Sequence, residues 1–193
     1  GMYGVARGGG VLSANGTTVP VNNPWLFAMG NGRWLGVPIP IWITVALVLA
    51  MHWVLSQTSF GQYTYAIGGN RMAAVRSGSN VRRHTRWLYT ISAVCAGVAG
   101  MIYTARFSAG AAQAGEPLLL DSIAAVVIGG ASLFGGSGTV IGTVIGALII
   151  AVIRNGMNLL HLKSFTQNIV FGLVILGAAI LDQWKNRRLG GRS

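Results

Sequence analysis

Long apolar runs, separated by polar and mostly basic segments, dominate the pattern of this chain. Span A covers residues 39–57, which contain no charged side chain. As a helix this run extends roughly 28 Å and matches the hydrocarbon core of a bilayer. Span B covers residues 87–105, span C residues 139–157 and span D residues 165–181. We predict that all four cross a membrane as α-helices.

A further apolar stretch, residues 118–134, is harder to interpret. It is short, carries Asp121 near its start and contains Gly129 and Gly130 before its end. It therefore forms either a short crossing helix or a broken helix that is backed by protein. A full crossing places the basic segment 58–86 and the basic C-terminal tail on the same side of the membrane, as the positive-inside rule favours. A re-entrant stretch would place the tail outside, against that rule.

These patterns predict the fold class and the organisation of the chain. We expect an all-α, polytopic transmembrane helical bundle with about five crossings after residue 38, one of them a short or broken helix. Residues 1–38, rich in Gly, Asn and Pro, are expected to be the end of a preceding helix plus an extracytoplasmic loop. Residues 39–193 form the C-terminal transmembrane domain. The start of the chain lacks the order of a signal peptide, and we expect that the natural N-terminus lies upstream of Gly1.

Composition supports this interpretation, because the chain is 52% hydrophobic and only 9% charged. A soluble domain usually carries roughly 25% charged residues. The formal net charge of +11 comes from 14 Lys and Arg against three acids, Glu116, Asp121 and Asp182. Since the basic residues lie mainly between apolar runs, they indicate membrane topology and not nucleic-acid binding.

The sequence offers no residues for catalysis or metal binding. It has no GxxxxGK[ST] phosphate-binding loop, so this chain does not hydrolyse ATP itself. The three histidines, His52, His84 and His161, are isolated from one another, and the one cysteine, Cys95, lies inside span B. Neither type shows the spacing of a metal site. We predict no catalytic residue, no metal and no cofactor.

Small residues at helical spacing predict close helix packing. Span B carries Gly97 and Gly100, each four residues after an alanine, and span C begins with Gly138, Gly142 and Gly146 at four-residue spacing. Two charged residues near the spans have structural interpretations. Asp121 is expected to cap a helix N-terminus, and Arg154 to extend its side chain to the membrane surface.

The basic segment between spans A and B contains the pattern GGNRMAAVRSG at residues 68–78. Asn70 is suited to cap a short amphipathic helix over residues 72–76, and Gly78 is suited to end it. A cytoplasmic partner could grip such a helix. The alternative is a solvated loop that only satisfies the positive-inside rule.

Three stretches carry a resemblance to a known family. The run YAIGGNRMAAVRSGSNVRR at residues 65–83 resembles the coupling loop of permeases from ribose- and xylose-type ABC importers. The stretches LDSIAAVVIGGASLFGG, from residue 120, and NGMNLL, from residue 155, are similar to later motifs of the same permeases. The likeness covers nearly the whole chain. Met72 and Ser79 depart from it, since Glu and Ile are usual there: the first position lacks a charge, and the second lacks an apolar side chain, that could contact the ATPase.

The resemblance implies a permease subunit that carries a simple sugar, such as ribose or xylose, across the bacterial inner membrane, with a cytoplasmic C-terminus. Its implied partners are cytoplasmic ABC ATPase subunits, a periplasmic sugar-binding protein, a second permease copy forming a homodimer and the lipid bilayer, with no nucleic acid. The implied ATPase-coupling residues share the loop: Gly69, Asn70, Arg71, Ala73, Ala74, Arg76 and Gly78.

Uncharged hydrogen-bonding residues near the outer ends of spans C and D are candidates for the substrate path: Asn155, Asn158, Gln167 and Asn168. Each could instead form interhelical hydrogen bonds or cap a helix. Two other functions remain open. One is a related permease for branched-chain amino acids, nucleosides or an autoinducer. The other is a structural membrane subunit without transport, whose basic loop binds anionic lipid.

Overall fold

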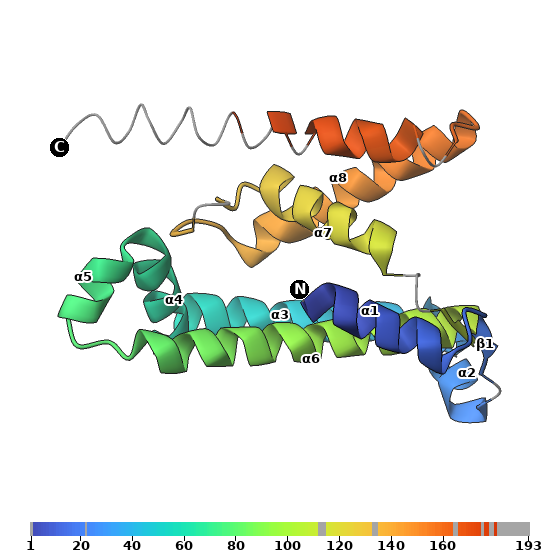
Figure 1. The fold of residues 1–193 in the computed structure, drawn as a ribbon, viewed down its shortest axis with the longest axis horizontal. Helices are drawn as coiled ribbons and strands as arrows, with labels where there is room; N and C mark the ends of the chain where they lie inside the picture. The colour runs from blue at the N-terminus through green and yellow to red at the C-terminus, as the bar shows by residue number, and fades with distance from the viewer. Residues whose placement is uncertain are drawn as a thin grey trace. The chain divides into compact units, whose positions relative to one another are not determined.

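The computed structural model describes residues 2–21, 23–111, 115–132, 135–163, 166–174, 176–177 and 180. Helices form most of the described chain (Figure 1). In chain order they are α1 (Met2–Ser13), α2 (Pro24–Asn31), α3 (Ile39–Gln57), α4 (Ser59–Gly69), α5 (Arg71–Arg76), α6 (Val81–Phe107), α7 (Glu116–Ile128) and α8 (Val140–Leu159). Residues 166–174 are also helical. The strands are β1 (Val19–Pro20), β2 (Arg33–Trp34), β3 (Val37–Pro38) and β4 (Ala109–Gly110).

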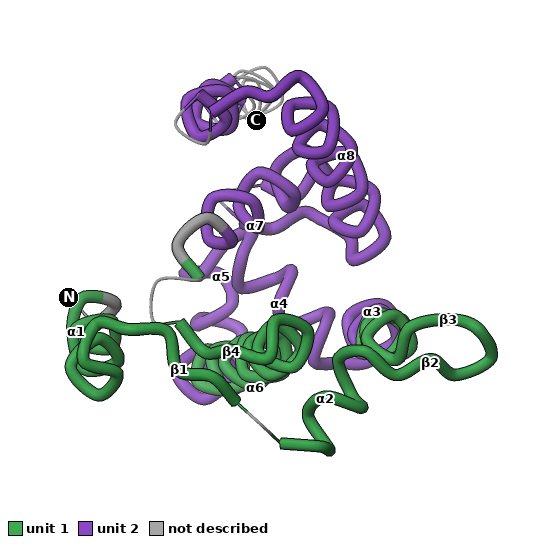
Figure 2. The backbone as a smooth tube through the Cα atoms, turned by 90° about the vertical axis from the view of Figure 1, so that its right-hand side faces the viewer, with its two compact units in different colours: residues 1–50, 85–116 green, residues 51–84, 117–193 purple. Residues whose placement is uncertain are grey.

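The chain divides into two compact units, which Figure 2 colours separately. Unit 1 comprises residues 1–50 and 85–116, and unit 2 comprises residues 51–84 and 117–193. The polar segment that follows α3 therefore belongs to the same unit as the C-terminal helices.

In unit 1, the segment before α3 is more ordered than the loop that the sequence predicted. Asn23 caps α2 by accepting a 3.0 Å hydrogen bond from the Trp25 amide, and Pro24 occupies an early helical position where its missing N–H costs nothing. The strands β2 and β3 form a hairpin whose turn residues, Leu35 and Gly36, both have positive φ. That geometry is typical of a tight two-residue hairpin turn.

A second strand pairing in unit 1 joins this segment to the end of α6. Strand β1 pairs with β4, with Val19 opposite Gly110 and Pro20 opposite Ala109. Gly30 of α2 lies against the backbone of Ala105, where an added Cβ would come within 2.7 Å of the Arg106 nitrogen. Contacts of this closeness require glycine and hold the segment to α6.

Helices α3, α6 and α8 are long and apolar enough to cross a membrane. Helix α3 has the same bounds as predicted span A. The most apolar windows of the three are only 6%, 6% and 17% buried within the chain. Apolar helices that hide so little of their surface need lipid or other helices around them. The structure thus agrees with an all-α transmembrane bundle.

Helix α6 begins at Val81, six residues before predicted span B. The Asn80 side chain accepts a 3.1 Å hydrogen bond from the Arg83 amide and so caps the helix at this earlier point. The extra turns carry Arg82, Arg83 and Arg86. A helix can include such charged residues, but an apolar pattern excludes them. The predicted start of the helix therefore lay too late in the sequence.

Helix α7 ends at Ile128, and the chain turns at Gly129 and Gly130, the latter with φ of +82°. Its 13 residues span roughly 20 Å, less than the hydrocarbon core. Helix α7 is therefore short and ends at the glycine pair. Residues 133–134 and parts of span D (residues 165, 175, 178, 179 and 181) lie outside the described residues, and the number of crossings stays a prediction.

The core of unit 2 forms where α7, α8 and helix 166–174 meet. Its buried residues are Ala124, Ala125, Ile150, Met157 and Phe171. Gly142 and Gly146, two of the glycines predicted to pack, lie at this junction, and an added Cβ on Gly146 would come within 2.8 Å of the Gly129 nitrogen. By contrast, a Cβ on Gly97 or Gly100 would meet nothing within 4 Å in the described part of the chain.

Candidate functional site

The segment with the strongest functional pattern, residues 69–78, forms a short capped helix. The Asn70 backbone is extended, and its side chain accepts a 3.0 Å hydrogen bond from the Ala73 amide at the start of α5. Gly78 follows the helix with φ of +82°, and its amide donates to the Val75 carbonyl at 3.1 Å. The cap and the stop are those predicted from the sequence. We call residues 69–78 the docking segment, after the role that the sequence predicts for them.

The docking segment presents most of its side chains to the surroundings. Ala74 is its one buried residue, at 6% exposure. Met72 and Val75 are 66% and 51% exposed, and Arg71 and Arg76 are exposed beside them. The segment therefore offers two apolar side chains flanked by two guanidinium groups, a surface suited to contact another protein.

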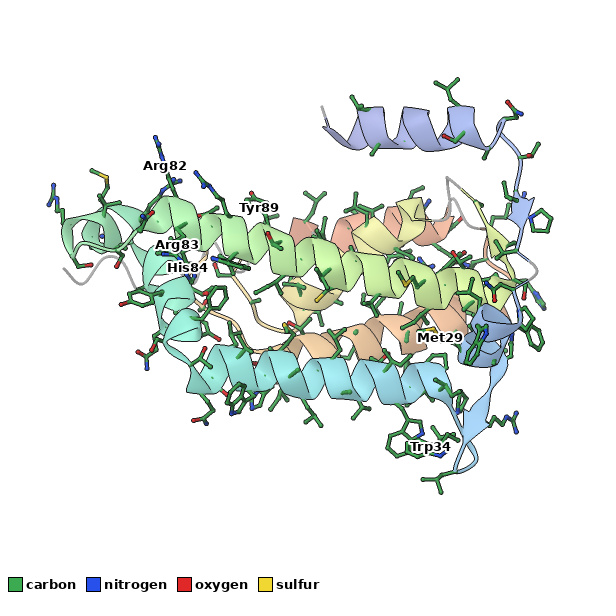
Figure 3. The ribbon with its side chains drawn as sticks, turned by 90° about the horizontal axis from the view of Figure 1, so that it is seen from below. Met29, Trp34, Arg82, Arg83, His84 and Tyr89 are labelled. Atoms are coloured by element: carbon green, nitrogen blue, oxygen red, sulfur yellow. The ribbon has the colours of Figure 1, made fainter. Side chains whose placement is uncertain are left out.

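Helix α4, which the sequence did not predict, supports the docking segment. It ends at Gly69, and Asn70 alone separates it from α5. The first turn of α6 contacts α4 through His84. The centroids of the His84 and Phe60 rings are 4.4 Å apart. His84 Nε2 is also 2.9 Å from Thr64 Oγ1. In Figure 3 His84 points toward α4, whereas Arg82 points away from it.

Thr64 joins His84 to the backbone of α4. Thr64 Oγ1 lies 2.8 Å from the Phe60 carbonyl oxygen as well as 2.9 Å from His84 Nε2. These contacts hold the start of α6 against α4.

A second contact on α4 joins segments that lie far apart in the sequence. Tyr65 Oη donates a 2.6 Å hydrogen bond to the Gly138 carbonyl, 73 residues away. Gly68 lies against Gly135 and Gly136, where an added Cβ would be 2.6 Å from the Gly136 nitrogen. The glycine-rich connection before α8 therefore packs on α4. No periodicity signals a contact between a helix and a distant loop, which is why the sequence did not reveal it.

At the far end of α8, Arg154 forms an ion pair with Asp121 of α7 at 2.7 Å. The guanidinium carbon also lies 5.2 Å from the centre of the Phe171 ring. The two predictions for these residues were wrong. Asp121 lies inside α7 and does not cap it, and Arg154 turns toward a counter-charge and an aromatic ring instead of the membrane surface. In a bilayer a charged pair is more favourable than two separate charges.

The four candidates for the substrate path fall into two groups. Gln167 is 8% exposed, and its Nε2 donates to Asn158 Oδ1 at 2.8 Å and to the Leu162 carbonyl at 3.0 Å. These two residues thus form the interhelical bond that was the structural alternative. Asn155 and Asn168 are exposed, and their side chains form no hydrogen bond with another described residue.

Metal binding receives no support from the described residues, among which no group of three His, Cys, Asp or Glu side chains could hold an ion.

Comparisons with known proteins match this chain to membrane permeases. Residues 1–179 match the family described as branched-chain amino acid transport system, permease component. The ribose import permease of Bacillus subtilis (strain 168) is 48% identical over 158 residues, which cover 81% of this chain and 49% of that protein. The ribose import permease of Escherichia coli (strain K12) is 44% identical over 190 residues, 95% of this chain and 59% of that protein.

A third relative carries a different sugar in its name. The L-arabinose transport system permease of Escherichia coli (strain K12) is 37% identical over 183 residues, 95% of this chain and 56% of that protein. This chain thus spans between about half and three-fifths of the length of these relatives. No solved structure matches it.

Proposed function

This chain belongs to the family of permease components of branched-chain amino acid transport systems, and from that premise we propose that it is the membrane part of an ATP-driven importer for a simple sugar. The expected substrate is a pentose such as ribose or xylose. The observation that carries the proposal is the identity of 44–48% to ribose import permeases across 81–95% of the chain. The three apolar helices and the exposed docking segment support it.

In the proposed mechanism the docking segment binds a cytoplasmic ATPase subunit. Met72 and Val75 supply apolar contact, and Arg71 and Arg76 supply charge. When two ATPase subunits close on ATP, they move the segment and change the packing of the membrane helices. The permease makes and breaks no covalent bond, so it needs neither a catalytic residue nor a cofactor.

The remaining partners follow from the same proposal. A periplasmic binding protein delivers the sugar to the outer face, and a second permease copy completes the path in the inner membrane. Asn155 and Asn168 are the candidates that remain free to contact a sugar hydroxyl. Asn158 and Gln167 hold helix ends together and would contribute only after their mutual bond opens.

Reconstitution tests the proposal. The full-length chain, its ATPase and its binding protein are placed in liposomes, and ATP-dependent uptake of labelled ribose, xylose and leucine is measured. We expect pentose uptake that disappears when the sequence of residues 69–78 is scrambled. Intact uptake by the scrambled protein would reject the docking assignment, and absence of any uptake with the native sequence would reject the transport function in favour of a structural subunit.

A second candidate substrate comes from the family description, which names branched-chain amino acids. The same liposomes decide between the two. Uptake of leucine with its own binding protein, without uptake of pentose, would establish the amino-acid alternative. Equivalent trials with nucleosides and an autoinducer address the other related permeases.

A further inference from the structure

The contact between α4 and the glycine-rich connection before α8 consists almost entirely of backbone. Residues 135–138 form this connection, which we call the glycine loop. A Cβ on Gly68 would be 2.6 Å from the Gly136 nitrogen, and a Cβ on Gly136 would be 2.8 Å from the Gly69 Cα. Side chains of any size would separate the two segments, so the glycines are required on both sides.

The conformation of the glycine loop also requires glycine. Gly135, Gly136 and Gly138 have φ of +95°, +82° and +148°, values that other residues rarely adopt. These conformations let the loop backbone approach the backbone of α4 more closely than residues with side chains could.

One side-chain hydrogen bond also forms part of this contact. The 2.6 Å bond from Tyr65 Oη ends at the carbonyl of Gly138, and Thr139 follows at once as the N-cap of α8. Thr139 Oγ1 accepts from the Gly142 amide at 3.0 Å. Tyr65 thus holds the residue next to the helix cap, and a displacement of α4 reaches α8 through one hydrogen bond.

The contact lies apart from the apolar core of unit 2. Its members do not belong to the buried cluster around Phe171, and Gly135 and Gly136 are exposed. A contact that buries no apolar side chain contributes little hydrophobic stability. Its tight geometry calls for another explanation.

We propose that the contact of Tyr65 and Gly68 with the glycine loop transmits movement of the docking segment directly to the N-terminus of α8. Tyr65 and Gly68 are then positioning residues. The proposal rests on the proposed function, because it requires an ATPase that moves α5. Without this contact, the covalent connection from Arg76 to Val140 runs through all of α6 and α7. A direct contact would transmit the displacement to the C-terminal helices without passing through α6 and α7.

The first test removes one hydroxyl. Tyr65→Phe deletes the bond to Gly138 and keeps the ring, while Tyr63→Phe on the same helix deletes a hydroxyl that forms no hydrogen bond among the described residues. We expect Tyr65→Phe to lower sugar uptake per ATP hydrolysed by about three- to tenfold, the factor that corresponds to one hydrogen bond. Tyr63→Phe should retain the native ratio. Both should co-purify with the ATPase in native amounts.

The second test uses the close approach itself. Gly68→Ala places a methyl group against the Gly136 backbone, whereas Gly156→Ala in α8 meets nothing within 4 Å. A spin label on Leu159→Cys, in a Cys95→Ser background, reports movement at the exposed end of α8. We expect an ATP-dependent change in label mobility in the Gly156→Ala protein and its loss in Gly68→Ala.

The outcomes separate the two proposals. Native uptake ratios and native label response in both Tyr65→Phe and Gly68→Ala would overturn the transmission proposal and leave the importer assignment standing. Failure of the unaltered full-length protein to bind the ATPase or to take up sugar would overturn the importer assignment. If Gly68→Ala does not fold, Tyr65→Phe decides, because it changes no packing volume except a hydroxyl.

Discussion

Arg154 shows how one residue can organise the end of a membrane helix. Its guanidinium contacts Asp121 on α7 at 2.7 Å and faces the ring of Phe171 in the following helix at 5.2 Å. The side chains of Arg154 and Asp121 are 31% and 17% exposed, so water screens the pair only in part. Arg154 Nε is buried without a partner among the described residues. The ion pair thus offsets a cost that the arginine alone would impose.

Removal of one member of this pair should destabilise the protein more than removal of both. Asp121→Asn leaves a cation without its counter-charge, and we expect the free energy of unfolding in mild detergent to fall by about 1–3 kcal/mol. The double variant Asp121→Asn, Arg154→Gln should recover part of that loss. Thermal unfolding of the two single variants and the double variant measures the coupling.

Arg106, an exposed residue in the last turn of α6, serves as the control for that measurement. Arg106→Gln should change the free energy of unfolding by less than about 0.5 kcal/mol. Additive losses from the two single variants would show that Asp121 and Arg154 do not interact in the folded protein.

At the scale of elements, glycine determines how closely α7 and α8 approach. Gly146 faces the Ala125 carbonyl and the Gly129 nitrogen, and Gly142 faces the Gly129 backbone. Between membrane helices the hydrophobic effect supplies little attraction, so close van der Waals contact has to supply it. The pair of helices then holds Asp121 opposite Arg154 and the glycine loop opposite α4.

Gly146→Ala should therefore destabilise the protein, although alanine favours helix. The methyl group would overlap the α7 backbone, and overpacking of this kind costs about 1–3 kcal/mol. The matched change Gly156→Ala in the same helix meets nothing within 4 Å and should be neutral or stabilising by up to about 1 kcal/mol. Melting temperatures of the two variants in detergent provide the comparison, and equal values would refute the packing role.

Elements were predictable from the sequence where a local rule decides them. The uncharged run 39–57 gave the bounds of α3, and Asn70 and Gly78 gave the cap and stop of α5. Helix α4 was missed, because its polar and glycine residues lack an apolar period and its contacts come from distant segments. The Asp121–Arg154 pair, 33 residues apart, and the Tyr65–Gly138 bond, 73 residues apart, depend on tertiary arrangement. Neither separation leaves a local signal.

At the scale of the whole molecule, the distribution of charged residues indicates how the chain is oriented in the membrane. Exposed arginines gather after α3, in the docking segment and in the first turns of α6, and a second basic segment lies in the C-terminal tail, outside the described residues. Arginine and lysine near crossing helices stay on the cytoplasmic side. The docking proposal requires the first segment on that side, where ATP is available. The number of membrane crossings determines whether the C-terminal tail lies on the same side as this first basic segment.

Cysteine labelling tests both points in one set of variants. In a Cys95→Ser background, Arg82→Cys, Ala111→Cys and Ser193→Cys are treated with a membrane-impermeant maleimide in spheroplasts before and after permeabilisation. The positive-inside rule leads us to expect immediate labelling of Ala111→Cys, which follows α6 on the outer side, and labelling of the other two only after permeabilisation. Immediate labelling of Arg82→Cys would contradict the docking orientation. If Ser193→Cys is labelled immediately while Arg82→Cys still needs permeabilisation, residues 118–134 enter and leave the membrane on one side. The chain then crosses the membrane an even number of times after residue 38, which returns its C-terminus to the outside.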